Sequence, residues 1–201
     1  MLYCRDAKEH GFHDNLYLEL DTYHNPSPSS NLSPLRQAIL QELSAANVFL
    51  VLESGEIVTP CLSRGTILPG VTRDSVLQLA KIFKDELQPF MAKSVGRDDV
   101  EVTVSERDVR VEDLNNAVEV FVTGTAAEVV PVQSIGTSPD DEEQFSVKFK
   151  HGESEPGPVT TKLLEMLREV VAEQRTHDEI HDWIHDVYAS PEDFRKGGIK
   201  K

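Results

Sequence analysis

The strongest constraint on the fold is a pair of apolar runs on either side of a Ser-Gly turn. Residues 47–52 (NVFLVL) and 56–59 form the two runs, and Ser54 and Gly55 lie between them. Short apolar runs that flank a turn of this composition are typical of a β-hairpin. We therefore expect a strand-rich fold built around this hairpin.

Apolar patterning predicts further strands and helices along the chain. Strands are expected at 15–20, 38–42, 100–105, 118–122, 128–135 and 145–149. Helices are expected from just after Gly70 to Leu87 and at 111–117, 160–174 and 177–188, with a polar connector at 89–99. Gly11 is typical of the C-cap of a helix that ends at 7–10. This order predicts an α+β fold with helices packed outside the strands.

The 201 residues suffice for one domain, which we place at 1–190, before a flexible tail at 191–201. Residues 21–37 are rich in Pro and Ser and predict a surface loop or insertion. A formal net charge of -15 argues against nucleic acid or an anionic membrane as a partner. No apolar stretch is long enough for a signal peptide or a bilayer span. We therefore expect a soluble protein. Cys4 and Cys61 are far apart and form no CxxC pair, so no disulfide scaffold is expected.

Residues 67–80 (ILPGVTRDSVLQLA) predict a helix that starts after a tight Pro69-Gly70 turn, with Thr72 as its N-cap. The backbone N–H groups of Val71 and Thr72, together with the helix dipole, would form an anion site that suits a phosphate. Taken alone, an ordinary capped helix that binds nothing is the better interpretation.

Residues 121–132 (FVTGTAAEVVPV) contain a second candidate turn. Gly124 frees the backbone, Thr125 offers a hydroxyl, and Ala126 and Ala127 leave the turn open. Consecutive N–H groups in such a turn can hold a carboxylate or a phosphate. The alternative is a plain hairpin connection.

Glu42, in the segment QELSAANVF, lies at the edge of a buried run. An unpaired buried charge is too costly to keep, so this carboxylate either faces solvent or has a partner. A protonated ring nitrogen would suit it.

In this order, QELSAANVF, ILPGVTRD, FVTGTAAEVVPV and GPVTTKLLEML resemble the fold-type IV pyridoxal-phosphate enzymes, most closely the branched-chain amino-acid aminotransferases. The resemblance runs from about Asp6 to the region of Trp183. It implies the large C-terminal domain of that fold, pyridoxal 5'-phosphate as cofactor, and a homodimer when full length. It also implies transfer of an amino group between leucine, isoleucine or valine and 2-oxoglutarate.

The resemblance also implies cofactor contacts. Glu42 would face the pyridine nitrogen and keep it protonated, so that the ring accepts electrons. Leu68 would lie against the ring. The turn at Gly70 would cup the phosphate through the backbone amides of Val71 and Thr72.

The same family uses its GTAA turn in two ways. Thr125 would contribute a hydroxyl to the cofactor phosphate. The backbone amides of Ala126 and Ala127 would hold the substrate α-carboxylate.

The chain departs from the family in its catalytic lysine. None of the ten lysines stands at the Schiff-base position, since Lys8 falls in the helix that follows it. The phosphate-binding arginine of the small N-terminal domain and the tyrosine beside the cofactor also have no counterpart. We expect a C-terminal fragment, without the small domain, that is inactive alone.

Two alternatives remain open. The chain could come from another fold-type IV enzyme, a D-amino acid aminotransferase or an aminodeoxychorismate lyase, although LPGVTRD and GTAA favour the branched-chain class. It could also be a non-catalytic dimerisation partner of an active paralogue. The compartment stays open between the cytoplasm and an organelle, either mitochondrion or plastid.

His177, His181 and His185 are spaced four residues apart and would line one face of the last predicted helix. Helical histidines at this spacing can bind zinc. The bland interpretation, a polar face opposite Ile180 and Trp183, is favoured, so no metal is expected.

Overall fold

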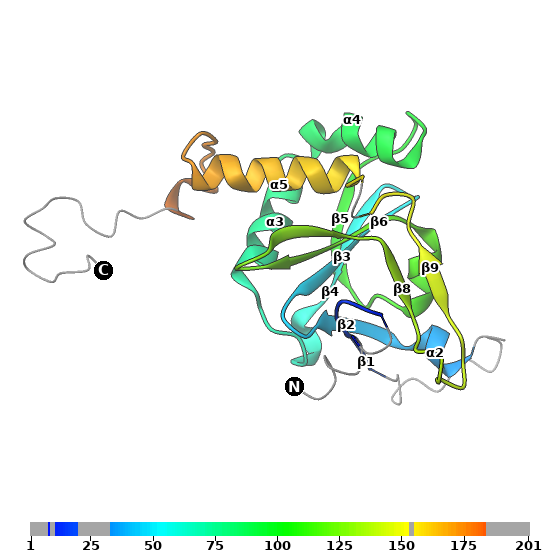
Figure 1. Ribbon diagram of the computed structural model, residues 1–201. Helices are drawn as coiled ribbons and strands as arrows, with labels where there is room; N and C mark the ends of the chain where they lie inside the picture. The colour runs from blue at the N-terminus through cyan, green and yellow to red at the C-terminus, as the bar shows by residue number, and fades with distance from the viewer. Residues whose placement is uncertain (1–7, 9–10, 20–32, 153–154, 184–201) are drawn as a thin grey trace, which may run out of the picture. The chain divides into compact units, whose positions relative to one another are not determined.

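The structure, a computed structural model, describes residues 8, 11–19, 33–152 and 155–183 (Figure 1). Contacts group the chain into two units, residues 1–164 and 165–201. Helix α5 (Pro158–Val171) runs across this boundary, and the short 3-10 helix η3 (His181–Trp183) lies in the second unit.

The first unit contains a seven-stranded sheet and a two-stranded sheet. The large sheet consists of β1 (Leu16–Glu19), β2 (Ile39–Leu43), β3 (Asn47–Leu52), β4 (Glu56–Pro60), β5 (Thr103–Arg107), β6 (Ala117–Gly124) and β7 (Glu128–Val132). Its path is β1-β2-β3-β4-β5, with β6 paired to β3 and β7 to β6. Among the described strands, only β4 and β5 pair in parallel. The small sheet pairs β8 (Ser134–Gly136) with β9 (Ser146–Lys148).

Helices connect the strands of this unit (Figure 1). They are α2 (Pro34–Gln37), α3 (Val71–Ile82), α4 (Lys84–Val95) and the 3-10 helices η1 (Leu62–Arg64) and η2 (Val111–Asn116). Helix α3 contacts β5 and β6, and α4 contacts β6. No helix among the described residues is both long and apolar enough to cross a bilayer.

Strand β3 is buried along its whole length, so both of its faces are covered. Val48, Leu50 and Leu52 point into one apolar core cluster. Because side chains alternate along a strand, Asn47, Phe49 and Val51 point to the opposite face. There the ring of Phe49 stacks on that of Phe121 from β6, with centroids 5.0 Å apart. One face of β3 therefore packs on the apolar core cluster, and the other contains the Phe49–Phe121 stack.

The predicted hairpin is confirmed, with β3 and β4 antiparallel around the turn. Gly55 has φ +91° there, and an added Cβ would lie 2.3 Å from the carbonyl oxygen of Glu101. The strands expected at 38–42, 118–122 and 145–149 are also present, with shifted ends. The strand expected at 100–105 begins only at Thr103, and that expected at 128–135 is divided between β7 and β8.

The polar connector predicted at 89–99 is wrong, because α4 covers most of it with Pro89 inside the helix. Helix α3 ends before Phe83, whose φ of -106° and ψ of 29° are not helical, and α4 starts directly after it. Proline removes one backbone hydrogen bond, but Leu87 and Met91 are fully buried on either side of it. Their burial outweighs the lost bond.

Two further predictions need correction where the structure describes them. Within the expected loop at 21–37, Ser33 caps the short helix α2, and Pro34 takes its first position; residues 21–32 lie outside the described residues. In the helix expected at 177–188, residues 177–183 form a turn and η3 instead. Residues 184–188 and the tail at 191–201 lie outside the described residues as well. At the start of the chain, Gly11 has φ +83° and its N–H donates to the carbonyl of Lys8, as a C-cap requires.

Candidate functional site

A bulge in β2 sets the direction of Glu42. On β1, Leu16 pairs with Leu43 and Leu18 with Leu40, so two steps along β1 face three along β2. Leu40 and Leu43 both pack on the core cluster. The extra residue reverses the alternation between them, so Glu42 is turned toward the other face. A strand without the bulge would direct this carboxylate into the apolar cluster.

The Glu42 carboxylate is held through one oxygen. Its Oε2 accepts hydrogen bonds from Asn47 Nδ2 at 3.1 Å and from the backbone N–H of Leu68 at 3.0 Å. Within the described residues, Oε1 takes part in no hydrogen bond. Asn47 Nδ2 also donates to the carbonyl of Leu68 at 3.0 Å. The carboxylate is therefore oriented, with its second oxygen left to accept from another donor.

Helix α3 begins at Val71, shortly after Leu68. The N–H of Gly70 donates to the carbonyl of Leu68 at 2.8 Å, which closes a tight turn around Pro69. Gly70, not Thr72, is the N-cap, and no side chain caps the helix. The prediction of Thr72 as N-cap is wrong because the helix already starts at Val71. The N–H groups of the first turn are thus available to an anion.

Gly70 is required by a close approach. An added Cβ would lie 2.3 Å from Asn47 Oδ1, so only glycine lets the start of α3 lie against β3. On either side of it, the side chains of Leu68 and Val71 are 69% and 78% exposed. Apolar surface of this extent beside an open helix start suits a ligand with both a flat apolar part and an anionic part.

The turn predicted around Gly124 is confirmed as the connection between β6 and β7. Thr125, Ala126 and Ala127 are all exposed there. An added Cβ on Gly124 would lie 3.2 Å from the carbonyl oxygen of Ala45, so this turn adjoins the one between β2 and β3. The three segments singled out from the sequence therefore meet at the Asn47 end of β3.

Two polar residues at this end were missed from the sequence. Asn47 is 6% exposed and Thr123 is 1% exposed, and they pair across the β3–β6 ladder. Paired residues share a face, so both side chains lie on the Glu42 side. Within the described residues, Thr123 Oγ1 has no hydrogen-bond partner. The available signal was a polar residue within or beside an otherwise apolar run.

Arg73 fixes the position of α3. Its side chain is 2% exposed, and Nη2 donates to the carbonyl of Pro60 at 2.9 Å and to Glu106 Oε2 at 2.7 Å. These bonds join the first turn of α3 to the ends of β4 and β5. Although Arg73 follows Thr72 in sequence, its guanidinium binds other parts of the fold.

A polar network fixes the segment that leads into the helix. Arg64 donates to both carboxylate oxygens of Asp108, at 3.1 and 2.7 Å, and to Glu19 at 3.3 Å. Gln41 donates to Glu19 at 3.0 Å and accepts from the hydroxyl of Thr66. Hydrogen bonds from Arg64 lower the pKa of Asp108 against the opposing effect of burial. The loop before Leu68 is thereby tied to β1 and β2.

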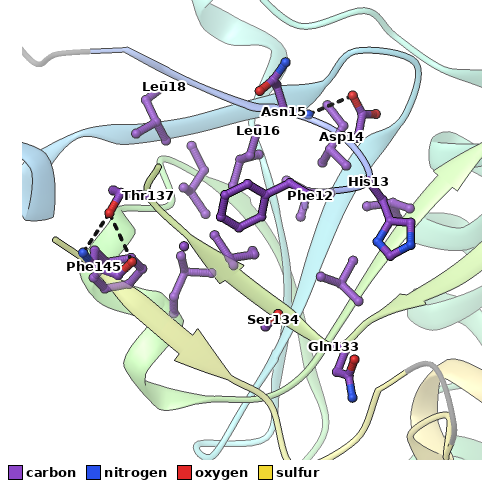
Figure 2. A pocket seen from close by; sticks show the side chains of 18 of the residues that line it. Phe12, His13, Asp14, Asn15, Leu16, Leu18, Gln133, Ser134, Thr137 and Phe145 are labelled. Atoms are coloured by element: carbon purple, nitrogen blue, oxygen red, sulfur yellow. Dashed lines mark hydrogen bonds between the residues drawn. The ribbon is translucent and has the colours of Figure 1, made fainter. Parts of the chain in front are cut away.

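Figure 2 shows a cavity of about 990 Å³, whose lining places it on the face of β3 opposite to Asn47. Leu40, Val48 and Val122 of the core cluster line it, and Figure 2 shows the ring of Phe12 among its side chains. Of the residues chosen from the sequence, only Ala127 lines this cavity. The cavity is therefore distinct from the polar convergence around Asn47.

His177 and His181 do not lie on one continuous helix. His177 Nδ1 accepts from the N–H of Glu179, and His181 Nε2 lies 2.9 Å from an oxygen of Asp182. Among the described residues, no group of three or more metal-binding side chains comes together. His185 lies outside the described residues.

Comparison with known proteins gives a consistent result. The model of the family described as amino-transferase class IV matches residues 3–135. The mitochondrial branched-chain-amino-acid aminotransferase 1 of Arabidopsis thaliana is 42% identical over 131 residues, which are 65% of this chain and 26% of that protein. A probable branched-chain-amino-acid aminotransferase of Thermotoga maritima is 40% identical over 124 residues, 62% of this chain and 34% of that protein. The chain thus spans about a quarter to a third of these relatives.

Solved structures show the same likeness. The branched-chain amino acid aminotransferase of Escherichia coli superposes with a TM-score of 0.60 at 27% identity, over 93% of this chain and 46% of that one. The enzyme of Thermobaculum terrenum in its PLP form gives a TM-score of 0.53 at 28% identity, over 87% and 42%. The predicted α+β fold is confirmed, and it matches part of those longer chains.

Proposed function

Because this chain belongs to the class IV aminotransferase family, we propose that residues 1–190 form the large, cofactor-holding domain of a branched-chain amino-acid aminotransferase. The observation that carries the proposal is the convergence at one end of β3. The Glu42 carboxylate, the uncapped start of α3 and the open turn after Gly124 meet there. These are the parts that a ring nitrogen, a phosphate and a carboxylate require.

The described residues fit pyridoxal 5'-phosphate. Glu42 Oε1 is an acceptor that no described residue uses, and it suits a ring N–H. The side chain of Leu68 offers exposed apolar surface to a flat ring. The first turn of α3 offers backbone N–H groups to a phosphate. Acceptor, apolar surface and donors occur in one region, as one elongated ligand needs.

Each residue then has a defined task. When bound, the cofactor supplies a protonated ring that takes up the electron pair released as the substrate Cα–H bond breaks. Glu42 holds the proton on the ring nitrogen, because a nearby carboxylate favours the cationic form. The backbone amides of Val71 and Thr72, beside Gly70, bind the phosphate.

The turn after Gly124 completes the proposed site. The hydroxyl of Thr125 donates to the phosphate. The backbone N–H groups of Ala126 and Ala127 bind the α-carboxylate of the substrate, which is leucine, isoleucine or valine with 2-oxoglutarate as the acceptor. Exposure of all three residues supports this assignment.

We propose further that the 201 residues bind the cofactor without catalysing transamination. Among the described lysines, Lys81 pairs with Glu106 and Lys162 with Glu86. No lysine lies in the segments that carry the proposed site. The homodimer expected for the full-length protein stays a prediction.

Titration with pyridoxamine 5'-phosphate, which binds without a covalent bond, tests the cofactor site. We expect one site per chain by calorimetry, and binding about tenfold weaker for Thr125→Val, the loss of one hydrogen bond to a charged group. Thr103→Val, an exposed threonine on β5, is the matched control and should bind unchanged. A folded chain that binds no pyridoxamine 5'-phosphate would refute the proposal.

Borohydride treatment with pyridoxal 5'-phosphate tests the second part. Mass spectrometry should find no lysine that is modified in preference to the others, and leucine should not be consumed. A unique lysine adduct accompanied by turnover of leucine would contradict the absence of catalysis and leave the binding site unaffected.

A further inference from the structure

We propose that Asn47 is the positioning residue of this site: its carboxamide orients the Glu42 carboxylate and ties it to the turn that precedes α3. The inference rests on the proposed function and extends it to a residue with no assigned role. Asn47 would touch neither the cofactor nor the substrate, and would act through Glu42 and Leu68.

The NH2 group of Asn47 donates to both of these segments. One NH2 group carries two donors, and Nδ2 lies 3.1 Å from Glu42 Oε2 and 3.0 Å from the carbonyl of Leu68. The Oδ1 of Asn47 lies against Gly70, where an added Cβ would be only 2.3 Å from it. Asn47 is 6% exposed, so its own position is determined by packing.

This arrangement orients a carboxylate that would otherwise rotate. The terminal torsion of glutamate is broad and has no strong preference of its own. Asn47 and the Leu68 N–H both donate to Oε2, and this leaves Oε1 as the oxygen for a ligand N–H. Without Asn47, Glu42 would keep one donor, and either oxygen could take the ligand.

The same side chain fixes the span between two binding groups. Glu42 and Leu68 are 26 residues apart in sequence and are joined directly by their mutual hydrogen bond and through Asn47. Glu42 would bind the ring nitrogen, and the helix after Leu68 would bind the phosphate. A rigid ligand that carries both groups needs this distance held constant.

Substitutions at this position separate the possibilities. Asn47→Ala removes both donors. Asn47→Ser keeps a small polar group with a single, shorter donor, and it serves if the alanine variant does not fold. Asn115→Ala is the matched control, because Asn115 is exposed and donates to the nearby carbonyl of Glu112.

The probe is pyridoxamine 5'-phosphate labelled with 15N in the ring, whose nitrogen shift against pH reports the protonation of the bound ring. In the unsubstituted chain we expect the ring to stay protonated well above the pH at which the free compound loses that proton. Asn47→Ala, or Asn47→Ser, should lower the ring-nitrogen pKa by about one unit, a tenfold change in protonation. Glu42→Gln should lower it further, and Asn115→Ala should not change it.

Each outcome decides the matter. If Asn47→Ala and Asn47→Ser weaken binding or stability but leave the ring-nitrogen pKa unchanged while Glu42→Gln lowers it, Asn47 is structural only and the inference fails. If the unsubstituted chain does not bind the probe, the proposed function fails, and the role of Asn47 fails with it. If Glu42→Gln also leaves the pKa unchanged, the error lies in the assignment of Glu42.

Discussion

At the scale of single residues, two buried threonines differ in one respect. Thr59 donates its hydroxyl to the carbonyl of Val48 at 2.8 Å, whereas the hydroxyl of Thr123 has no partner among the described residues. A buried hydroxyl without a partner loses its bonds to water and gains none. Thr123→Val should therefore raise the free energy of unfolding by about 1 kcal/mol in urea titrations, and Thr59→Val should lower it by about 1 kcal/mol. Equal destabilisation by both would show that Thr123 has a partner.

At the scale of elements, the start of α5 is held by a carboxylate from β6. Glu119 is 1% exposed and accepts from the N–H groups of Val159 and Thr160, at 3.0 and 2.8 Å, and from the hydroxyl of Thr160 at 2.6 Å. An added Cβ on Gly157 would lie 1.9 Å from the Cδ of Glu119, so glycine is needed for this approach. A negative charge at a helix start is stabilising, and here it is also buried.

Glu119→Gln should lower the free energy of unfolding by about 2–3 kcal/mol. The reason is that the new NH2 group faces N–H donors and leaves one of them without an acceptor. Urea denaturation measures the change. Glu101→Gln, at an exposed position, is the control and should stay within about 0.5 kcal/mol of the unsubstituted chain. A similar small effect at Glu119 would mean that this capping contributes little.

At the scale of the whole molecule, ion pairs join segments that are distant in sequence. Arg107 pairs with Glu56 at 2.9 Å and with Asp113 at 3.0 Å, which connects β4, β5 and η2. The pKa of Glu56 is lowered, first by its hydrogen bond from Arg107 and in spite of burial. The pKa of Asp108 is lowered mainly by Arg64. Both carboxylates are therefore better stabilised as anions in the folded state than in the unfolded chain.

A lowered carboxyl pKa contributes stability that is complete above the unfolded pKa and is lost as pH falls through the folded pKa. The free energy of unfolding should thus be level from pH 7 to about 5 and should fall below about pH 4. Thermal melts across this range measure it. Glu56→Gln should reduce the acid-induced loss, and Glu101→Gln should not. Equal slopes for the two variants would contradict the role of Arg107.

Features with a local cause were predictable from the sequence. The hairpin at Gly55 follows from a glycine whose φ of +91° other residues rarely adopt. The turn after Gly124 was marked by its run of small residues. The amphipathic pattern of α5 is equally local. Helix α4 was missed at Pro89 because the penalty of proline is local, while the burial of Leu87 and Met91 that offsets it is not.

By itself, the sequence determined where the short turns lie, since Gly, Pro and Ala act through their own backbone preferences. Only the tertiary structure decided what these segments do together. The direction of Glu42 depends on a bulge, and a bulge exists only relative to the paired strand β1. The partners of Glu42, Asn47 and Leu68, come from different elements, and hydrogen bonds between them form only once packing has brought Gly70 against β3.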